Sequence, residues 1–180
     1  IVSAIEHECV NAAAAAAGLP VFTVSVDDTG TVSLASLRAL LAEAPAPALV
    51  SVMYANNEMG AVQPLAQISA IAKEFGALVH SDAVQAAGKI PIDVNLLGTN
   101  YLTLSAHKIG GPQGVGAIIL SPTAPLKPLV IGGGQELGRR SGTENVAGAA
   151  GFGEAAIEAL SHLNEMDRLG ALRDKMEDDL

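Results

Sequence analysis

Residues 49–82 read LVSVMYANNEMGAVQPLAQISAIAKEFGALVHSD. Apolar runs at Leu49–Tyr54 and Ala77–Ser81 have the length and composition of buried strands. Between Pro64 and Gly76 the apolar residues instead recur every three or four positions, which is typical of one face of a helix that begins at a proline and ends before a glycine. The order strand, helix, strand predicts a βαβ unit, in which the two strands are parallel and the helix covers one face of the sheet.

The same alternation of short apolar runs and helical patterns extends in both directions from this segment. We predict strands at Val21–Val26, Leu49–Tyr54, Ala77–Ser81, Tyr101–Ser105 and Val115–Leu120. Each is bounded by Gly, Pro, Asn or Asp, which favour turns. The pattern predicts an α/β fold, a three-layer α/β/α arrangement with a mainly parallel sheet.

Three helices are predicted before residue 82. The helix at 64–76 turns inward a face that consists of Leu65, Ile68, Ile71 and Phe75. A second helix follows Ser33, which can cap it. Its shared face consists of Leu34, Leu37, Leu40 and Leu41. The alanine run Ala12–Ala17 predicts a third, tightly packed helix that ends at Gly18.

Composition limits the kinds of function to consider. The chain has 180 residues, 49% hydrophobic and 16% charged, with a net charge of -9, which indicates a packed globular protein. An acidic chain repels phosphate backbones and anionic lipids, so neither nucleic acid nor a membrane is expected as a partner. No apolar run approaches the ~20 residues of a membrane span, and no basic segment leads into a hydrophobic stretch at the N-terminus, so we expect a cytoplasmic location. The single cysteine, Cys9, is interpreted as a packing residue, and no Cys/His cluster has the spacing of a metal site.

Residues 151–180 differ in character from the rest of the chain. Their apolar residues recur at helical spacing and are Ile157, Leu160, Leu163, Met166, Leu169, Leu172 and Met176. This pattern predicts one long helix with a buried stripe. Since the chain has no initiator Met and no helix-stopping residue near its end, we expect an excised piece. The stripe would pack on a partner, such as a second domain that is absent here.

Polar residues gather directly after three of the predicted strands. They are Asn56-Asn57-Glu58, Asp82 and Ser105-Ala106-His107-Lys108. Ligands of a parallel sheet bind beyond the carboxyl ends of the strands, so the three clusters can converge on one pocket. Each alone is also ordinary turn chemistry, and only their coincidence favours a site.

Lys108 and Asp82 carry the chemistry that these clusters suggest. Lys108 follows an apolar strand and precedes residues 109–112, Ile-Gly-Gly-Pro, so we expect a partly buried turn. There a lysine can lose its proton and form a Schiff base with an aldehyde, although a counter-ion for phosphate or carboxylate is the alternative role. Asp82 can keep a ring nitrogen protonated, as pyridoxal cofactors require. The pair points to pyridoxal 5'-phosphate (PLP).

Five motifs occur in the order and spacing of a known enzyme family. They are Glu6-His7-Glu8, Asn56-Asn57-Glu58-Met59-Gly60, His80-Ser81-Asp82-Ala83-Val84-Gln85, Ser105-Ala106-His107-Lys108, and Gly132-Gly133-Gly134-Gln135-Glu136 continuing to Arg140-Ser141-Gly142-Thr143-Glu144-Asn145. Together they resemble the cysteine desulfurases of the NifS/IscS type, which are fold-type I PLP enzymes of the class V aminotransferase group. The resemblance implies that residues 1–150 form the PLP-binding large domain of such a transferase, incomplete at its N-terminus. Residues 151–180 would then form a long helix that leads to a small C-terminal domain, which is absent.

The resemblance also implies a role for each motif. Lys108 would bind the cofactor as a Schiff base and move a proton at the substrate Cα, with Asp82 on the pyridinium nitrogen. Gln85 would hydrogen-bond the phenolic oxygen of the cofactor. His7 would stack on the exposed face of the ring and act with Lys108 in catalysis.

Four further residues would complete the site by the same resemblance. Asn57 would lie near the phenolic oxygen and the substrate carboxylate. Ser105 and His107 would hold the cofactor phosphate. Thr143 would reach the phosphate of the neighbouring subunit, which implies a homodimer with shared active sites.

The implied reaction converts L-cysteine to L-alanine. The sulfur would pass to an enzyme cysteine as a persulfide and then to a sulfur-acceptor protein, as in iron-sulfur cluster assembly. The family's nucleophilic cysteine and its substrate-carboxylate arginine would lie beyond Leu180. We therefore expect these 180 residues alone to bind the cofactor at best in part and to be inactive.

Three alternatives remain open at the level of sequence. A selenocysteine lyase or another class V aminotransferase would share the same lysine and aspartate. A non-catalytic scaffold of the same fold would bind a sulfur-transfer partner without PLP. A nucleotide-binding α/β domain is the least favoured, because Gly132–Gly134 lacks the helix and ribose-binding acid of a dinucleotide loop.

Overall fold

The structure, a computed structural model, describes residues 1–180. The strands are β1 (Val2–Ser3), β2 (Thr23–Val24), β3 (Leu49–Ser51), β4 (Leu78–Asp82), β5 (Tyr101–Ser105) and β6 (Gly116–Leu120). The α-helices are α1 (Glu8–Ala16), α2 (Leu34–Glu43), α3 (Leu65–Glu74), α4 (Val94–Leu97), α5 (Val146–Ser161) and α6 (Glu165–Asp178). Two 3-10 turns are η1 (Ala106–Ile109) and η2 (Glu136–Gly138).

The strands form one six-stranded sheet in the order β2-β1-β3-β4-β5-β6. Every pair of neighbours from β2 to β5 is parallel. The edge strand β6 differs, since Ala106 N–H donates to Val115 O and Ser121 N–H donates to Asn100 O, which is an antiparallel pattern. The predicted α/β class with a mainly parallel sheet is confirmed.

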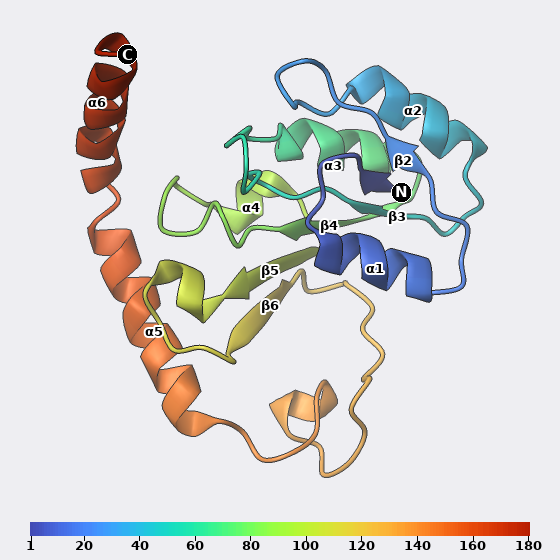
Figure 1. Cartoon of the computed structure of the whole chain (residues 1–180). Helices are drawn as coiled ribbons and strands as arrows, with labels where there is room; N and C mark the ends of the chain where they lie inside the picture. The colour runs from blue at the N-terminus through green and yellow to red at the C-terminus, as the bar shows by residue number, and fades with distance from the viewer. The chain divides into compact units, whose positions relative to one another are not determined.

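The chain divides into two compact units. The first comprises Ile1–Ala86, Asp93–Leu104 and Ile118–Ala124, and the second Ala87–Ile92, Ser105–Ala117 and Pro125–Leu180. In the first unit α2 and α3 pack against each other on one face of the strands, and α1 lies on the other face (Figure 1). The largest fully buried apolar side chains of this unit are Val24, Leu37, Val50, Val52, Met53, Leu65, Ile68, Val79 and Leu102.

Local sequence sets the ends of α2 and α3. The Ser33 hydroxyl caps α2 by accepting from Ser36 N–H at 3.2 Å. Gly76, at φ 66°, ends α3 as predicted, because this left-handed conformation favours glycine. The prediction that Phe75 faces inward is wrong: it is 40% exposed, since it is the C-cap residue, where the chain leaves the helical path.

Helix α1 is less buried than the alanine run suggests. It begins at Glu8 and ends at Ala16, and none of its residues is buried, so the prediction of tight packing is wrong. Alanine accounts for the helix through its high propensity, but its small side chain contributes little apolar area. Cys9, predicted as a packing residue, is exposed for the same reason: this helix buries no face.

The stretch predicted as one long helix is divided between α5 and α6. The Ser161 hydroxyl donates to Glu158 O at 2.8 Å, and His162 Nδ1 lies 2.9 Å from the same oxygen. Side chains that bond backbone carbonyls compete with the helical ladder, which accounts for the break. The predicted stripe is not buried within this chain, since Ile157 is 64% and Leu172 53% exposed. No helix, α5 and α6 included, combines the length and apolar character needed to cross a membrane.

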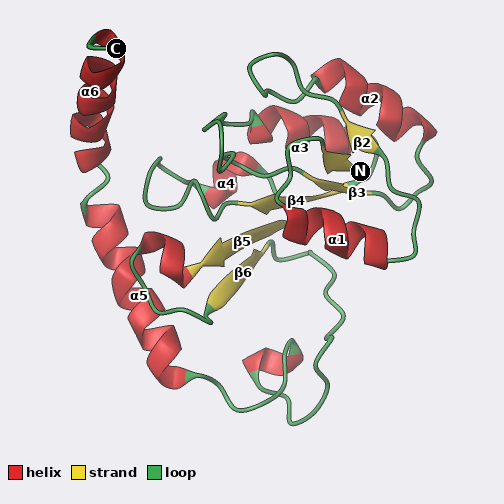
Figure 2. Ribbon diagram, viewed as in Figure 1, coloured by secondary structure: helices red, strands yellow, loops and turns green.

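The strands differ from the predictions mainly in length. β2 is limited to Thr23–Val24, and β3 ends at Ser51, although Tyr54 N–H still donates to Asp82 O at 2.8 Å. β1 and α4 are not predicted, because elements of two and four residues are too short to show a period. Figure 2 shows the loop-rich segment between β6 and α5, in which η2 is the sole regular element.

Replacing Ile68 by alanine is expected to lower the free energy of unfolding by about 3 kcal/mol, because the fully buried side chain would leave a cavity. Phe75→Ala is the matched control on the same helix. Its side chain is partly exposed, so we expect a loss of about 1 kcal/mol. Urea denaturation of both variants measures the difference, and equal losses would contradict the burial of Ile68 in the core.

Candidate active site

Asp82 ends β4 at the carboxyl edge of the sheet, directly opposite Thr103 of β5. Its half-buried carboxylate accepts from Val84 N–H through Oδ1 at 2.9 Å, and it takes part in no ion pair. This bond forms the turn after the strand and leaves Oδ2 available to a ligand. Gln85, also half-buried, lies three residues further along the chain, in the same turn.

The turn that carries Asn57 is built on its neighbour Asn56. The Asn56 Oδ1 accepts from Glu58 N–H at 2.8 Å and from Met59 N–H at 2.9 Å. Its Nδ2 donates to Ile5 O at 3.0 Å, which ties the turn to the loop after β1. Asn57 is therefore presented on an exposed tip, where its amide is free to meet a ligand.

His7 is the N-cap residue of α1. Its Nδ1 accepts from Cys9 N–H at 3.2 Å and lies 3.0 Å from Cys9 Sγ. Because Nδ1 is an acceptor, the proton of the neutral ring is on Nε2. The exposed ring thus has one edge fixed by the helix and the other free for a ligand.

Glu6 is a functional candidate that sequence reasoning missed. The residue is 8% exposed, and its Oε1 accepts from Ser3 Oγ at 2.7 Å and from Met53 N–H at 2.6 Å. Burial raises the pKa of Glu6 to about 7, the two hydrogen bonds oppose this, and the charge of Asp82 raises the pKa further. The signal in the sequence was an acid directly after the apolar pair Ala4-Ile5 and directly before His7.

His80 is a second residue without a predicted role. Its Nδ1 lies 2.7 Å from Ser51 Oγ on β3, and its Nε2 lies 3.2 Å from Thr103 Oγ1 on β5. Burial lowers the pKa of His80, and the charge of Asp82 opposes this in part, so the ring is neutral at pH 7. Two residues apart on one strand, His80 and Asp82 share a face of the sheet, and this spacing could have identified it.

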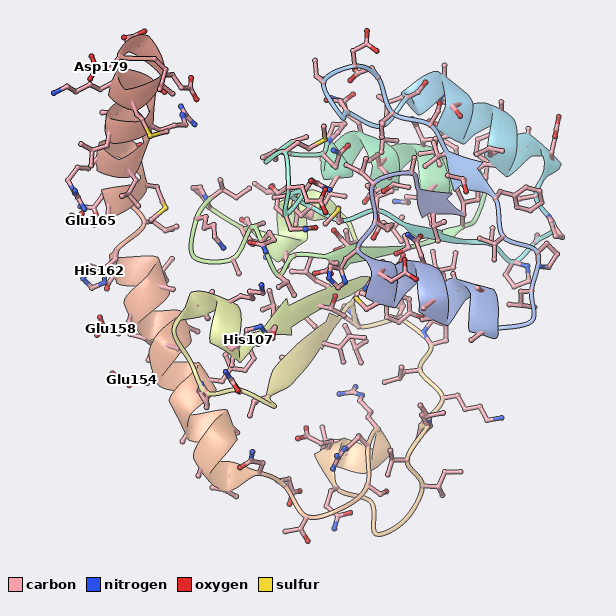
Figure 3. The ribbon with its side chains drawn as sticks, viewed as in Figure 1. His107, Glu154, Glu158, His162, Glu165 and Asp179 are labelled. Carbon is pink, nitrogen blue, oxygen red and sulfur yellow. The ribbon has the colours of Figure 1, made fainter.

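The second unit holds Lys108. It lies in η1, three residues after β5 ends, and is exposed, which contradicts the expected partly buried turn. The reason is that η1 packs against α5 with Ala106 fully buried, whereas Lys108 in the same turn is exposed. Ser105 Oγ lies 2.8 Å from His107 Nδ1, so the two predicted phosphate ligands form a pair; His107, which belongs to η1, is labelled in Figure 3.

A second amine lies near Lys108. Lys89 follows Gly88, which packs on η1 so closely that a Cβ there would lie 3.2 Å from Ile109 Cγ2. Burial, followed by the charge of Lys108, lowers the pKa of Lys89. Two neighbouring amines give this part of an acidic protein a local positive charge, which suits an anionic ligand.

Thr143 lies on the exposed segment that leads into α5. The preceding loop closes on itself: Ser141 N–H donates to Val130 O at 3.0 Å, and Gly142 N–H donates to Gln135 Oε1 at 3.1 Å. Thr143 itself is exposed. Hydrogen bonds of Ser141 and Gly142 thus fix the start of this segment, while the exposed Thr143 is free to contact another molecule.

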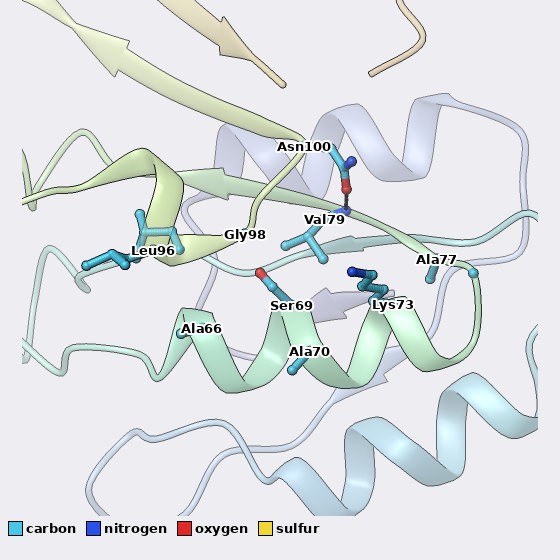
Figure 4. Close-up of a pocket in the computed structure, with 11 residues that line it drawn as sticks. Ala66, Ser69, Ala70, Lys73, Ala77, Val79, Leu96, Gly98 and Asn100 are labelled. Atoms are coloured by element: carbon cyan, nitrogen blue, oxygen red, sulfur yellow. Dashed lines mark hydrogen bonds between the residues drawn. The ribbon is translucent and has the colours of Figure 1, made fainter. Parts of the chain in front are cut away.

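A hollow of about 510 Å³ lies elsewhere in the first unit, between α3 and α4 (Figure 4). It is lined by small and apolar residues together with Ser69, Lys73 and Asn100. Gly76 and Asn100 on its wall precede β4 and β5, so the hollow is at the amino ends of these strands. None of the predicted site residues lines it, and it is not the candidate active site.

The buried Glu6 is expected to make stability depend on pH. A pKa of about 7 in the folded chain, against an ordinary 4.5, means that the folded state binds more protons between these values. The free energy of unfolding should therefore fall as pH rises from about 4.5 to 7, by roughly 3 kcal/mol at about 1.4 kcal/mol per pKa unit.

Urea denaturation at pH 5 and pH 8, on the wild type and on Glu6→Gln, measures this effect. His80 gives a slope of the opposite sign below pH 6.5, because its folded pKa is lowered. That contribution is common to both proteins and cancels in the comparison. Identical pH profiles for the two proteins would show that Glu6 is not a perturbed acid.

The chemistry of these residues suits PLP. Asp82 is a carboxylate outside any ion pair that could face a ring nitrogen, and Lys108 is a primary amine outside any ion pair that could hold an aldehyde. Ser105, His107 and Lys89 offer donors to a phosphate. Along the chain, the strand paired with β4 leads directly into η1, which connects the two groups of residues.

Comparison with known proteins identifies the class. The model of the aminotransferase class-V family matches residues 1–178, and the chain belongs to this family. A cysteine desulfurase of Klebsiella pneumoniae is 44% identical over 180 residues, which cover 98% of this chain and 45% of the relative.

Solved structures agree with this class. The X-ray structure of a NifS-like protein from Rickettsia africae has a TM-score of 0.93 at 41% identity, over 99% of this chain and 50% of that one. A structure of SspA in complex with cysteine has a TM-score of 0.76 at 36% identity, over 86% of this chain and 46% of that one. The chain thus spans about half the length of the curated relatives that it matches.

Proposed function

We propose that the protein is a PLP-dependent cysteine desulfurase and that residues 1–150 are its cofactor-binding large domain. The observation that supports this best is the placement of Asp82 at the end of β4 and of Lys108 just after the paired strand β5. These are the two groups that the cofactor requires, in a chain whose relatives bear the name cysteine desulfurase at 42–47% identity.

PLP, when bound, supplies an electron sink for the carbanion formed at the substrate Cα. Lys108 would hold the aldehyde carbon and move the Cα proton, and Asp82 would keep the ring nitrogen protonated. His7 would pack on the ring, with Gln85 and Asn57 on its phenolic oxygen. Ser105 and His107 would bind the phosphate.

The substrate would be L-cysteine. Its C–S bond breaks, its sulfur forms an S–S bond with a cysteine thiolate of the enzyme, and the carbon takes up a proton to give L-alanine. The persulfide sulfur would then pass to an acceptor protein, in keeping with a role in iron-sulfur cluster assembly in the cytoplasm.

Thr143 would act across a homodimer, on the phosphate held by the neighbouring subunit. Its exposure on a segment with a fixed base supports this assignment. Sedimentation of the whole enzyme as a monomer at micromolar concentration would contradict it.

Reductive labelling tests the cofactor assignment without requiring turnover. The protein is mixed with PLP, treated with borohydride and digested, and the labelled peptide is identified by mass spectrometry. We expect the label on Lys108, and Lys108→Ala should abolish it. A label distributed over exposed lysines such as Lys127, or concentrated on Lys89, would exclude the proposed site.

A further inference from the structure

Glu6 is a buried acid to which the proposed chemistry assigns no task. It lies in the loop between β1 and α1, directly before His7, and is 8% exposed. No cationic side chain pairs with it. A buried acid without a cationic partner lowers the stability of the fold. Its hydrogen bonds show which segments of the chain it holds in place.

The contacts of Glu6 fix its own loop to a second segment. Oε1 accepts from Ser3 Oγ at 2.7 Å and from Met53 N–H at 2.6 Å, so one oxygen joins the end of β1 to the segment that follows β3. The Glu6 carbonyl accepts from Asn11 Nδ2 of α1 at 3.3 Å. Side chain and backbone together restrain the residue next to His7.

Asn56 makes a second link between the same two segments. Its Nδ2 donates to Ile5 O at 3.0 Å, and its Oδ1 accepts from two backbone N–H groups of the turn that presents Asn57. The loop before His7 is thus joined to residues 53–56, which lead into the turn of Asn57, at two points, by Glu6 and by Asn56.

We propose that Glu6 is a positioning residue, whose Oε1 locks the His7 loop to the Met53–Asn56 segment and so sets where the His7 ring and the Asn57 amide stand. The roles of His7 and Asn57 toward PLP rest on the proposed function, but the link itself does not. It requires an acceptor oxygen, not a negative charge.

Both protonation states of Glu6 can make this link. Oε2 is buried without a partner, so the proton of the acid form belongs there and Oε1 remains an acceptor. The raised pKa, about 7, means that both forms are populated near neutral pH. Glutamine has the shape of the acid form and keeps the oxygen acceptor, whereas alanine has no acceptor and methionine has only a weak sulfur acceptor.

Cys9 supplies a direct readout of the position of His7. Its sulfur lies 3.0 Å from His7 Nδ1, and it is the single cysteine of the chain. An imidazole nitrogen at this distance can take the thiol proton as the sulfur attacks a disulfide reagent. The rate at which Cys9 reacts with dithiodipyridine, followed on the Cys9 peptide by mass spectrometry so that a cysteine beyond Leu180 does not contribute, therefore reports whether the ring is in place, without any cofactor.

The test compares this rate at pH 7 in five proteins: wild type, His7→Ala, Glu6→Ala, Glu6→Gln and Glu8→Gln. His7→Ala sets the rate without the imidazole, which we expect to be at least about threefold lower. Glu6→Ala should approach that rate, and Glu6→Gln should remain within about twofold of wild type. Glu8→Gln, an exposed acid on the other side of His7, is the matched control and should also remain near wild type.

Wild-type reactivity in a folded Glu6→Ala protein would overturn the proposal, as would a Glu6→Gln rate as low as that of His7→Ala. If circular dichroism shows that Glu6→Ala does not fold, Glu6→Met takes its place, because it fills the volume without an oxygen acceptor. A slowed Cys9 together with failed labelling of Lys108 would support the positioning role and remove the desulfurase assignment. Wild-type reactivity of Cys9 in Glu6→Ala together with labelling of Lys108 would remove the positioning role and support the desulfurase assignment.

Discussion

A Lys108→Ala variant of the enzyme that contains this chain is expected to form alanine from L-cysteine at least about 1000-fold more slowly than the wild type. The loss combines two functions of one amine, holding the cofactor aldehyde and moving the proton at Cα. Fold stability should change by less than about 0.5 kcal/mol, because Lys108 is exposed. Alanine formation and urea denaturation, measured on the same samples, separate the two effects.

Lys127→Ala is the control for this experiment. Lys127 is an exposed lysine of the same unit, placed between β6 and η2, and makes no ion pair. Its removal changes net charge by the same amount as the loss of Lys108, so activity should stay within about twofold of wild type. A Lys108→Ala enzyme that kept more than a tenth of wild-type activity would show that another amine holds the aldehyde and moves the Cα proton.

The parallel sheet could be predicted because its strands and helices carry different periods. The stretch 49–82 places an apolar strand, a helix of period 3.6 and a second strand in succession, and the structure has β3, α3 and β4 there. β1 could not be predicted, since its two residues gain their structure from parallel pairing with β2 and β3 and not from their own pattern. Phe75 fits the helical period yet is exposed, because the helix ends there.

A site residue could be predicted only where its chemical type differs clearly from that of its neighbours in the sequence. Asp82 and Lys108 are conspicuous because they lie at or just after the ends of apolar strands. Glu6 and His80 act through contacts with Met53 and Thr103, which are distant in sequence, and no local pattern reveals those contacts. The exposure of Lys108 could not be predicted from the sequence either, since it depends on how η1 packs against α5.

Asp82→Asn is expected to lower alanine formation by about 100-fold or more, because a neutral amide of the same size cannot keep a ring nitrogen protonated. The Val84 N–H bond at 2.9 Å can be kept by the asparagine oxygen, so the turn should be preserved. Asp82→Glu keeps the charge and should recover part of the activity. If Asp82→Asn were as active as wild type, the ring nitrogen would have another partner.

Asp82→Asn is also expected to change the pKa of Glu6 in the first unit, an effect that requires no cofactor. Burial is the larger cause of the raised pKa of Glu6, and the charge of Asp82 adds to it. Removal of that charge should lower the Glu6 pKa from about 7 while leaving it above its ordinary value of 4.5. The pH range over which the free energy of unfolding falls should then end at a lower pH in Asp82→Asn than in wild type. An unchanged range would mean that Asp82 and Glu6 do not share one electrostatic environment, a result that loss of activity alone could not reveal.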